Sequence, residues 1–250
     1  MKNLIWAEWK KLRRSSIILF TLIATILIAA IVLFAGQSAT IEGYYLDDPG
    51  WYMTMMQPWA TMFVLPAVIS MLGSYMICRE EQDDTLKSLL LIPVSEIKLT
   101  AAKMMVTFVL SVLIYLLLFA ITLITELILH CSGVSVGMAL HFFKCYLLEG
   151  IGVFLAVSPI IALVSYTKKS YWLALLLAEI YSFVGLFMSM SNTMKTLYPI
   201  TGLMGVAGYY DTSLNSQIVS SLVLLLCGLF SFFLLMGHSR QKKGGEIHVK

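Results

Sequence analysis

Three acidic residues stand inside long apolar runs of the sequence, and these are the side chains most able to do chemistry there. They are Glu126, Glu149 and Glu179, and Lys144 lies five residues before Glu149. A charge within a bilayer is costly, so such residues face a bundle interior, a cavity or an opposite charge. Either Lys144 neutralises Glu149 or Glu126 and fixes helix packing, or the three carboxylates line a path for a cationic substrate. A third interpretation is that they reach the membrane surface.

Four residues offer soft metal ligands near the ends of two of these apolar runs: His130, Cys131, His141 and Cys145. Imidazole and thiolate suit a soft cation. Their spacing matches no standard metal site, and interfacial histidines and small buried thiols explain them more simply. We therefore predict no metal site in this chain.

The sequence lacks the motifs of several common enzymes. It has no GxxxxGK phosphate loop, no HExxH and no GxSxG, and its four histidines are dispersed. The chain is therefore not expected to hydrolyse ATP, and an intramembrane enzyme is disfavoured because no nucleophile–base pair can be named.

The composition is that of an integral membrane protein. Hydrophobic residues make up 59% of the 250 residues, charged residues make up 12%, and the mean hydropathy is +0.87. Soluble chains are roughly 45–50% apolar and about 25% charged. Apolar runs near the ~20 residues that cross a bilayer predict six spans, at about 16–35, 58–77, 104–129, 138–164, 171–188 and 218–236.

The remaining segments are more polar. Residues 1–14 combine Trp with basic residues and predict a helix that lies at the membrane interface. We expect Pro66 to kink the second span, and residues 189–216 to be partly helical at the surface. A polar tail, 237–250, ends the chain.

The distribution of basic residues predicts the topology. Of the 17 Lys and Arg, 15 lie in residues 1–14, the connection between spans two and three with its flank, the connection between spans four and five, or the tail; only Lys144 and Lys195 lie elsewhere. Because Lys and Arg accumulate on the cytoplasmic side, both termini are predicted to be cytoplasmic. Six spans give the same answer, so the expected fold is all-α with six membrane spans and both ends inside.

The longest polar interruption, residues 79–100, is predicted to be a short amphipathic segment at the cytoplasmic surface. Leu86, Leu89 and Leu90 share one face at helical spacing, and Pro93 ends the helix. Such a segment can receive force from a soluble partner, although an ordinary solvated loop with a proline stop is the alternative.

This segment resembles the one between helices two and three of the membrane subunits of ABC type-2 transporters. The family pattern is a Glu, a Gly-Thr-Leu, a Leu-Leu pair, a Pro-Val-Ser and a Lys. It corresponds here to Glu80 or Glu81, Asp84-Thr85-Leu86, Leu89-Leu90, Pro93-Val94-Ser95, and Lys98 or Lys103. Asp84 replaces the usual Gly. The overall layout of the chain is also similar to that of the family.

The resemblance implies a permease whose residues 79–100 form a coupling helix on a separate ATP-binding subunit. Force would pass through Glu80, Glu81, Thr85, Leu86, Leu89, Leu90 and Pro93. The chain itself would bind no cofactor; ATP and Mg²⁺ would bind the partner, present in two copies. A second permease chain, identical or related, would complete the pore in the bacterial cell membrane, and no nucleic acid would be involved.

The implied cargo is an antimicrobial peptide of the lantibiotic type or another amphipathic molecule, because the chain resembles permeases that protect bacteria from such peptides. Export of a lipid-linked glycan, a drug or sodium is an alternative within the family. A structural or sensory membrane protein without transport is the alternative outside it.

Overall fold

The computed structural model describes residues 2–13, 15–38, 48–82, 96–130, 133–167 and 171–247. Regular structure in these ranges is helical throughout, with no strand, which confirms the all-α fold expected from the sequence. The helices are α1 (Lys2–Leu12), α2 (Ser16–Ser38), α3 (Trp51–Trp59), the π-helix η2 (Ala60–Val64), α4 (Leu65–Gln82), α6 (Glu96–Leu129), α7 (Val136–Thr167), α8 (Trp172–Met188), α9 (Asn192–Leu197), α10 (Pro199–Ala207) and α11 (Leu214–Ile247).

Five helical stretches in the described residues are long and apolar enough to cross a membrane: Ser16–Gly36, Trp51–Arg79, Ile97–Leu129, Val136–Val164 and Leu214–Gly237. Helix α8 is also apolar but has only 17 residues. Large apolar side chains such as Ile23, Leu27 and Phe230 are more than half exposed, as expected on a surface that faces lipid. The long helices overlap five predicted spans, and α8 overlaps the remaining one.

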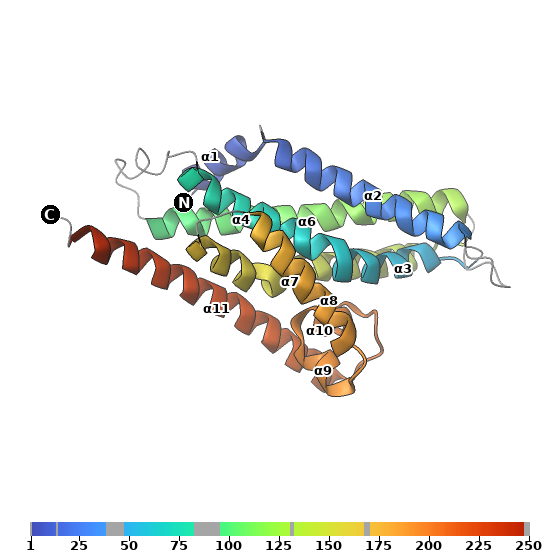
Figure 1. The fold of residues 1–250 in the computed structure, drawn as a ribbon. Helices are drawn as coiled ribbons and strands as arrows, with labels where there is room; N and C mark the ends of the chain where they lie inside the picture. Colours follow the sequence, from blue (N-terminus) through green and yellow to red (C-terminus); the bar gives the residue numbers. More distant parts are fainter. Residues whose placement is uncertain are drawn as a thin grey trace.

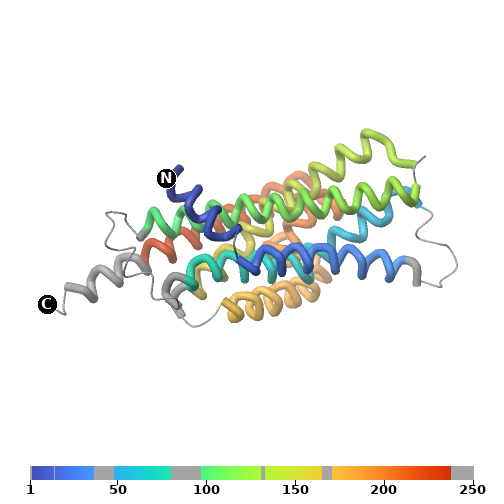
Figure 2. Tube along the Cα trace, turned by 90° about the horizontal axis from the view of Figure 1, so that it is seen from above, coloured from blue at the N-terminus to red at the C-terminus, as the bar shows by residue number. Residues whose placement is uncertain are grey.

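The helices form an elongated bundle in which α7 is central (Figure 1). Helix α7 packs against α4, α6, α10 and α11, and its residues Tyr146, Val153 and Val157 are fully buried. Helix α2 lies along α6 on one side of the bundle (Figure 2). The bundle core is therefore built around α7.

One end of the bundle collects several helix ends, and we name it the basic end. Helix α1, the end of α4, the start of α6 and the C-terminal part of α11 all lie there (Figure 1). Helix α1 packs against α6, where Leu12 and Glu8 are buried, while Trp6 is 64% exposed. The side chain of Lys10 lies over the Trp6 ring at 4.9 Å. This arrangement suits the interfacial helix predicted at residues 1–14.

The irregularity predicted at Pro66 is a π-helical segment rather than a simple kink. Helices α3, η2 and α4 follow one another without a break, and η2 ends at Val64, two residues before Pro66. Proline has no N–H to donate and its ring crowds the carbonyl four residues earlier. A wider π turn directly before the proline accommodates both effects.

The connection 189–216 differs from the prediction that its helical part lies at the surface. Helix α9 has no buried residue, but α10 is buried along most of its length. Helix α10 packs against α7 and α11, and Gly202 permits the approach, because a Cβ there would lie 2.8 Å from Ser220 Oγ. It begins at Pro199, which suits a first helical turn, and ends at Gly208 with φ 91°.

Candidate functional site

The predicted coupling residues lie mostly outside the described residues. Helix α4 ends at Gln82 and α6 begins at Glu96. The structure describes none of the side chains that are predicted to transmit force. These are Glu80, Glu81, Thr85, Leu86, Leu89, Leu90 and Pro93. The structure does place the two helix ends that flank them at the basic end, beside α1 (Figure 1). The coupling role of residues 79–100 therefore stays a prediction, although the structure places the two helix ends to which the segment is joined.

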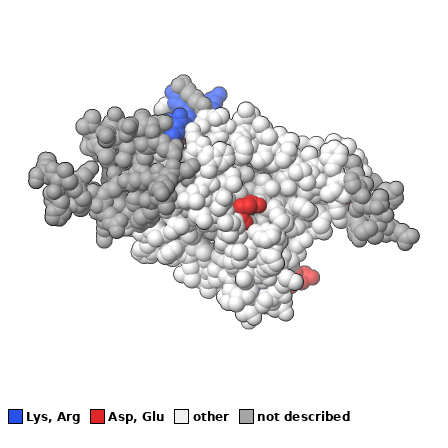
Figure 3. All heavy atoms as spheres, in the orientation of Figure 1, with Lys and Arg blue, Asp and Glu red and all other residues white. Residues whose placement is uncertain are grey.

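Basic side chains gather at this same end. Helix α1 exposes Lys2 and Lys10, and the turn after it exposes Arg13. Figure 3 shows Lys and Arg clustered over α1, whereas the middle of the described surface on this face carries none. Such a distribution is typical of the cytoplasmic end of a membrane protein.

The carboxylate of Glu149 lies in the bundle core beside the π-helix. It is fully buried, and Thr61 Oγ1 donates to its Oε2 at 3.2 Å. Tyr115 Oη lies 3.0 Å from the same Thr61 hydroxyl. Glu149 Oε1 is buried without a hydrogen-bond partner among the described residues. A buried acid, a threonine on a π turn and a tyrosine thus form one polar cluster from three helices.

The predicted pairing of Lys144 with Glu149 or Glu126 is wrong. Lys144 is exposed, whereas both carboxylates are buried. Successive residues of a helix are rotated by roughly 100°, so residues five apart point about 140° from each other. Lys144 and Glu149 therefore occupy different sides of α7.

The carboxylate of Glu126 anchors the turn that precedes α3. Its Oε1 accepts a hydrogen bond from the Gly50 backbone N–H at 2.6 Å, and His130 Nδ1 lies 3.0 Å from the same oxygen. Gly50 has φ 89°, a left-handed conformation that favours glycine. Glu126 Oε2 is buried without a hydrogen-bond partner in the described part of the chain.

Glu179 lies apart from the other two acidic residues. It is exposed on α8, next to Leu176 and Ile180, which are 54% and 55% exposed. Figure 3 shows acidic side chains only as isolated groups on the described surface of this face, away from the Lys and Arg cluster over α1. Glu179 is thus exposed, whereas Glu126 and Glu149 are buried in separate polar contacts, and the predicted contact of the three carboxylates with substrate stays a prediction.

The metal-ligand candidates are divided between two contacts. His141 Nε2 lies 3.6 Å from Cys145 Sγ within α7, whereas His130 contacts Glu126. Cys131 lies outside the described residues. Among the described residues, no group of three His, Cys, Asp or Glu could hold a metal ion.

The end of the bundle near α9 and α10 is held by tyrosines. Tyr198 Oη donates to the Tyr181 carbonyl oxygen at 2.6 Å, which ties the start of α10 to α8. Burial raises the pKa of Tyr198 to about 12, so its hydroxyl keeps its proton at physiological pH. Lys195 Nζ lies 3.5 Å from the centre of the Tyr210 ring.

The sequence pattern of a family described as "ABC-2 family transporter protein" matches residues 4–185. The match includes α1 to α7 and most of α8, together with residues 79–100, and covers well over half of the chain. The chain belongs to the ABC-2 transporter family. This confirms the resemblance drawn from residues 79–100, and with the long apolar helices it indicates a multi-pass membrane protein.

A named relative of this ABC-2 protein is the bacitracin transport permease protein BCRB of Bacillus licheniformis. The two are 31% identical over 134 residues, which is 54% of this chain and 64% of the relative. The chain thus matches less than two thirds of the length of that permease.

The hydrogen-bond partners of Glu149 and Glu126 in this ABC-2 protein were not predicted from the sequence. Thr61 and Glu149 are 88 residues apart, and Gly50 and Glu126 are 76 apart, so no local spacing relates them. The only signal is that Thr61, like Glu149, is a polar residue in an apolar run. His130 could have been found, because it stands four residues after Glu126 on the same helix face.

Proposed function

We propose that this protein is the membrane-spanning permease subunit of an ATP-driven ABC exporter. Membership of the ABC-2 family over residues 4–185 is the observation that carries this proposal. The chain has no phosphate-loop motif, so ATP and Mg²⁺ bind a separate subunit and this chain is not an enzyme.

Two copies of the ATP-binding subunit dock on residues 79–100 of two permease chains, which are identical or related. The Leu face of this segment, Leu86, Leu89 and Leu90, fills an apolar cleft of the partner, and Glu80 and Glu81 meet its basic residues. The position of the α4 end and the α6 start at the basic end supports this arrangement, because a cytoplasmic partner needs access to both.

The proposed cargo is an antimicrobial peptide, with the lantibiotic type as one candidate class. The name of the relative, a bacitracin transport permease, supports a peptide antibiotic. Another amphipathic molecule, such as a lipid-linked glycan or a drug, is the alternative. The exposed carboxylate of Glu179 on α8 is a proposed contact for a cationic peptide.

ATP hydrolysis by the complex in lipid tests this function. We expect bacitracin or a lantibiotic to stimulate hydrolysis, and we expect Leu89→Asp to abolish the stimulation, because a charge on the Leu face prevents docking. Ser88→Asp is the matched control, since Ser88 lies in the same segment but off that face.

Each outcome has a distinct meaning. Basal hydrolysis without a peptide response would keep the permease and remove the proposed cargo. A complex that survives Leu89→Asp with full stimulation would contradict the coupling assignment. A chain that never co-purifies with an ATP-binding subunit would favour a structural or sensory role.

A further inference from the structure

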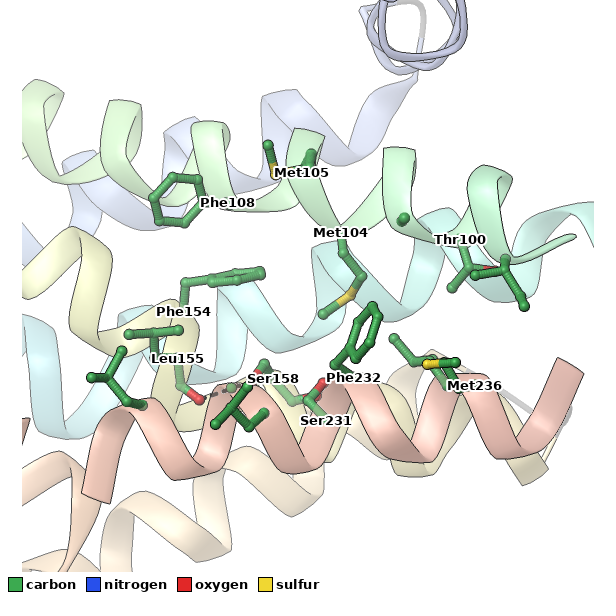
Figure 4. A pocket seen from close by; sticks show the side chains of 16 residues that line it. Thr100, Met104, Met105, Phe108, Phe154, Leu155, Ser158, Ser231, Phe232 and Met236 are labelled. Atoms are coloured by element: carbon green, nitrogen blue, oxygen red, sulfur yellow. Dashed lines mark hydrogen bonds between the residues drawn. The ribbon is translucent and has the colours of Figure 1, made fainter. Parts of the chain in front are cut away.

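An apolar groove runs between α6 and α11, with α7 as its floor (Figure 4). We name it the α6–α11 groove; its volume is about 510 Å³. Met104 of α6 and Phe232 of α11 point toward each other across it (Figure 4). At its inner end Phe108 and Phe154 pack edge to face, with ring centres 5.3 Å apart. The volume lies within the ~300–1,000 Å³ of ligand pockets.

The length of the groove matches one leaflet of a bilayer. It is lined by α6 from Ile97 to Phe108 and by α11 from Leu225 to Met236. At 1.5 Å per residue, each stretch is roughly 16 Å long. The hydrocarbon core of a bilayer is about 30 Å thick, so the groove extends through about half of it. Because Ile97 is the second residue of α6, this half lies on the side of the basic end.

The groove offers hydrocarbon contacts but few hydrogen bonds. Ser158 Oγ donates to the Leu155 carbonyl oxygen at 2.9 Å, and Ser231 Oγ donates to the Ser158 carbonyl oxygen at 2.9 Å. Both serine hydroxyls that line the groove are therefore already used as donors. A peptide backbone in the groove would leave costly unsatisfied polar groups, whereas an acyl chain has none to satisfy.

Basic residues stand within a few positions of both lining stretches along the chain. Lys98 is exposed one residue after Ile97, at the start of α6. Helix α11 continues past Met236 into a stretch that contains Arg240, Lys242 and Lys243. Basic residues between helices on the cytoplasmic side attract anionic lipid headgroups.

We propose that the α6–α11 groove binds one acyl chain of an anionic phospholipid, whose headgroup lies at Lys98. The lipid belongs to the leaflet that contains α1. It fills the space between α6, which follows the predicted coupling segment, and α11. This site is separate from the buried acidic clusters of Glu126 and Glu149, and it does not depend on which cargo the protein exports.

Photo-crosslinking in nanodiscs tests the proposal. The full chain is reconstituted in phosphatidylcholine that contains a small fraction of phosphatidylglycerol with a diazirine in the middle of one acyl chain. We expect labelled peptides from residues 97–108 and 225–236. We expect Ala101→Phe, which fills the groove, to remove this labelling. Val109→Phe is the matched control, because Val109 is exposed on the same helix outside the groove.

The headgroup is tested by Lys98→Gln and by the same probe with a phosphocholine headgroup. One basic residue near the surface is worth about 1 kcal/mol to an anionic lipid, so each change is expected to reduce labelling about fivefold. Lys98 is exposed, so Lys98→Gln is not expected to affect folding.

Three results would overturn the proposal. Labelling spread evenly over all exposed faces of α6 and α11 would show that the groove is not a site. Absence of label from residues 97–108 and 225–236, with label elsewhere on the chain, would show that lipid does not occupy the groove. Loss of labelling on addition of bacitracin would assign the groove to cargo, whereas a failed transport assay with intact labelling would leave the lipid site standing.

Discussion

Glu126 joins the turn before α3 to the C-terminal end of α6 through a single carboxylate oxygen. That oxygen receives the Gly50 N–H and lies 3.0 Å from His130 Nδ1. Gly50 is itself buried, so its N–H has no access to water if the carboxylate is removed. Glu149, by comparison, accepts one hydrogen bond, from Thr61. The two buried acids thus make different contributions, and Glu126 is the one that fixes the backbone.

Glu126→Ala is expected to destabilise the folded chain by about 2 kcal/mol, because the buried Gly50 N–H loses its acceptor. Thermal unfolding of the purified protein in detergent measures the change. Glu126→Gln is the control, since its amide oxygen can still accept from Gly50, and it should cost clearly less. Equal losses for the two variants would show that charge rather than the Gly50 hydrogen bond matters.

Helices α6 and α7 pack closely at Gly150, and the importance of this contact can be tested by substitution. A Cβ on Gly150 would lie 3.0 Å from the Val112 Cα and 3.1 Å from the Tyr115 Cβ. Backbone cannot yield as a flexible side chain does, so Gly150→Ala should destabilise the protein by about 1–3 kcal/mol. The melting temperature in detergent reports the effect.

Gly137→Ala is the matched control for this substitution in the same helix. Gly137 is exposed, and its Cβ would meet only Ser135 Oγ, at 3.9 Å. Alanine is the better helix former, so this variant is expected to be neutral or slightly more stable. A loss at Gly137 as large as that at Gly150 would contradict a packing explanation.

The sequence predicted the long helices well because each is apolar over more than one face, and hydropathy alone detects that property. It did not predict that α10 is buried, because residues 199–207 contain a proline and two glycines, which are also typical of surface turns. Nor did it predict η2, because Pro66 indicates only that the helix is disturbed, not how. Packing against α7 explains why α10 is buried, and backbone geometry at Pro66 explains why η2 forms.

At the scale of the whole molecule, the basic end indicates which end of the bundle faces the cytoplasm. A tag inserted at Asp48, which is exposed before α3, should be labelled by antibody on intact cells, because the predicted topology puts this position outside. A tag at the N-terminus should be labelled only after the membrane is opened. A tag at Asp48 accessible only from inside would contradict this topology.

The family of the molecule could be predicted from the sequence because the pattern in residues 79–100 is local. The site could not be predicted to the same degree. The partners of Glu149 and Glu126 come from helices far apart in the sequence, and the predicted Lys144 pairing failed because helix rotation separates residues five apart. Most of the predicted coupling residues themselves lie outside the described residues.

Helix α6 has 34 residues and is therefore roughly 51 Å long. A close contact with α7, Val112 against Gly150, lies near its midpoint. It begins within residues 79–100, and its other end carries Glu126, which holds the Gly50 turn. If α6 moved as a rigid rod about this contact, a sideways push on its start would swing its far end in the opposite direction by a similar distance. The beginning of α3 would move with it, because Glu126 holds the Gly50 turn.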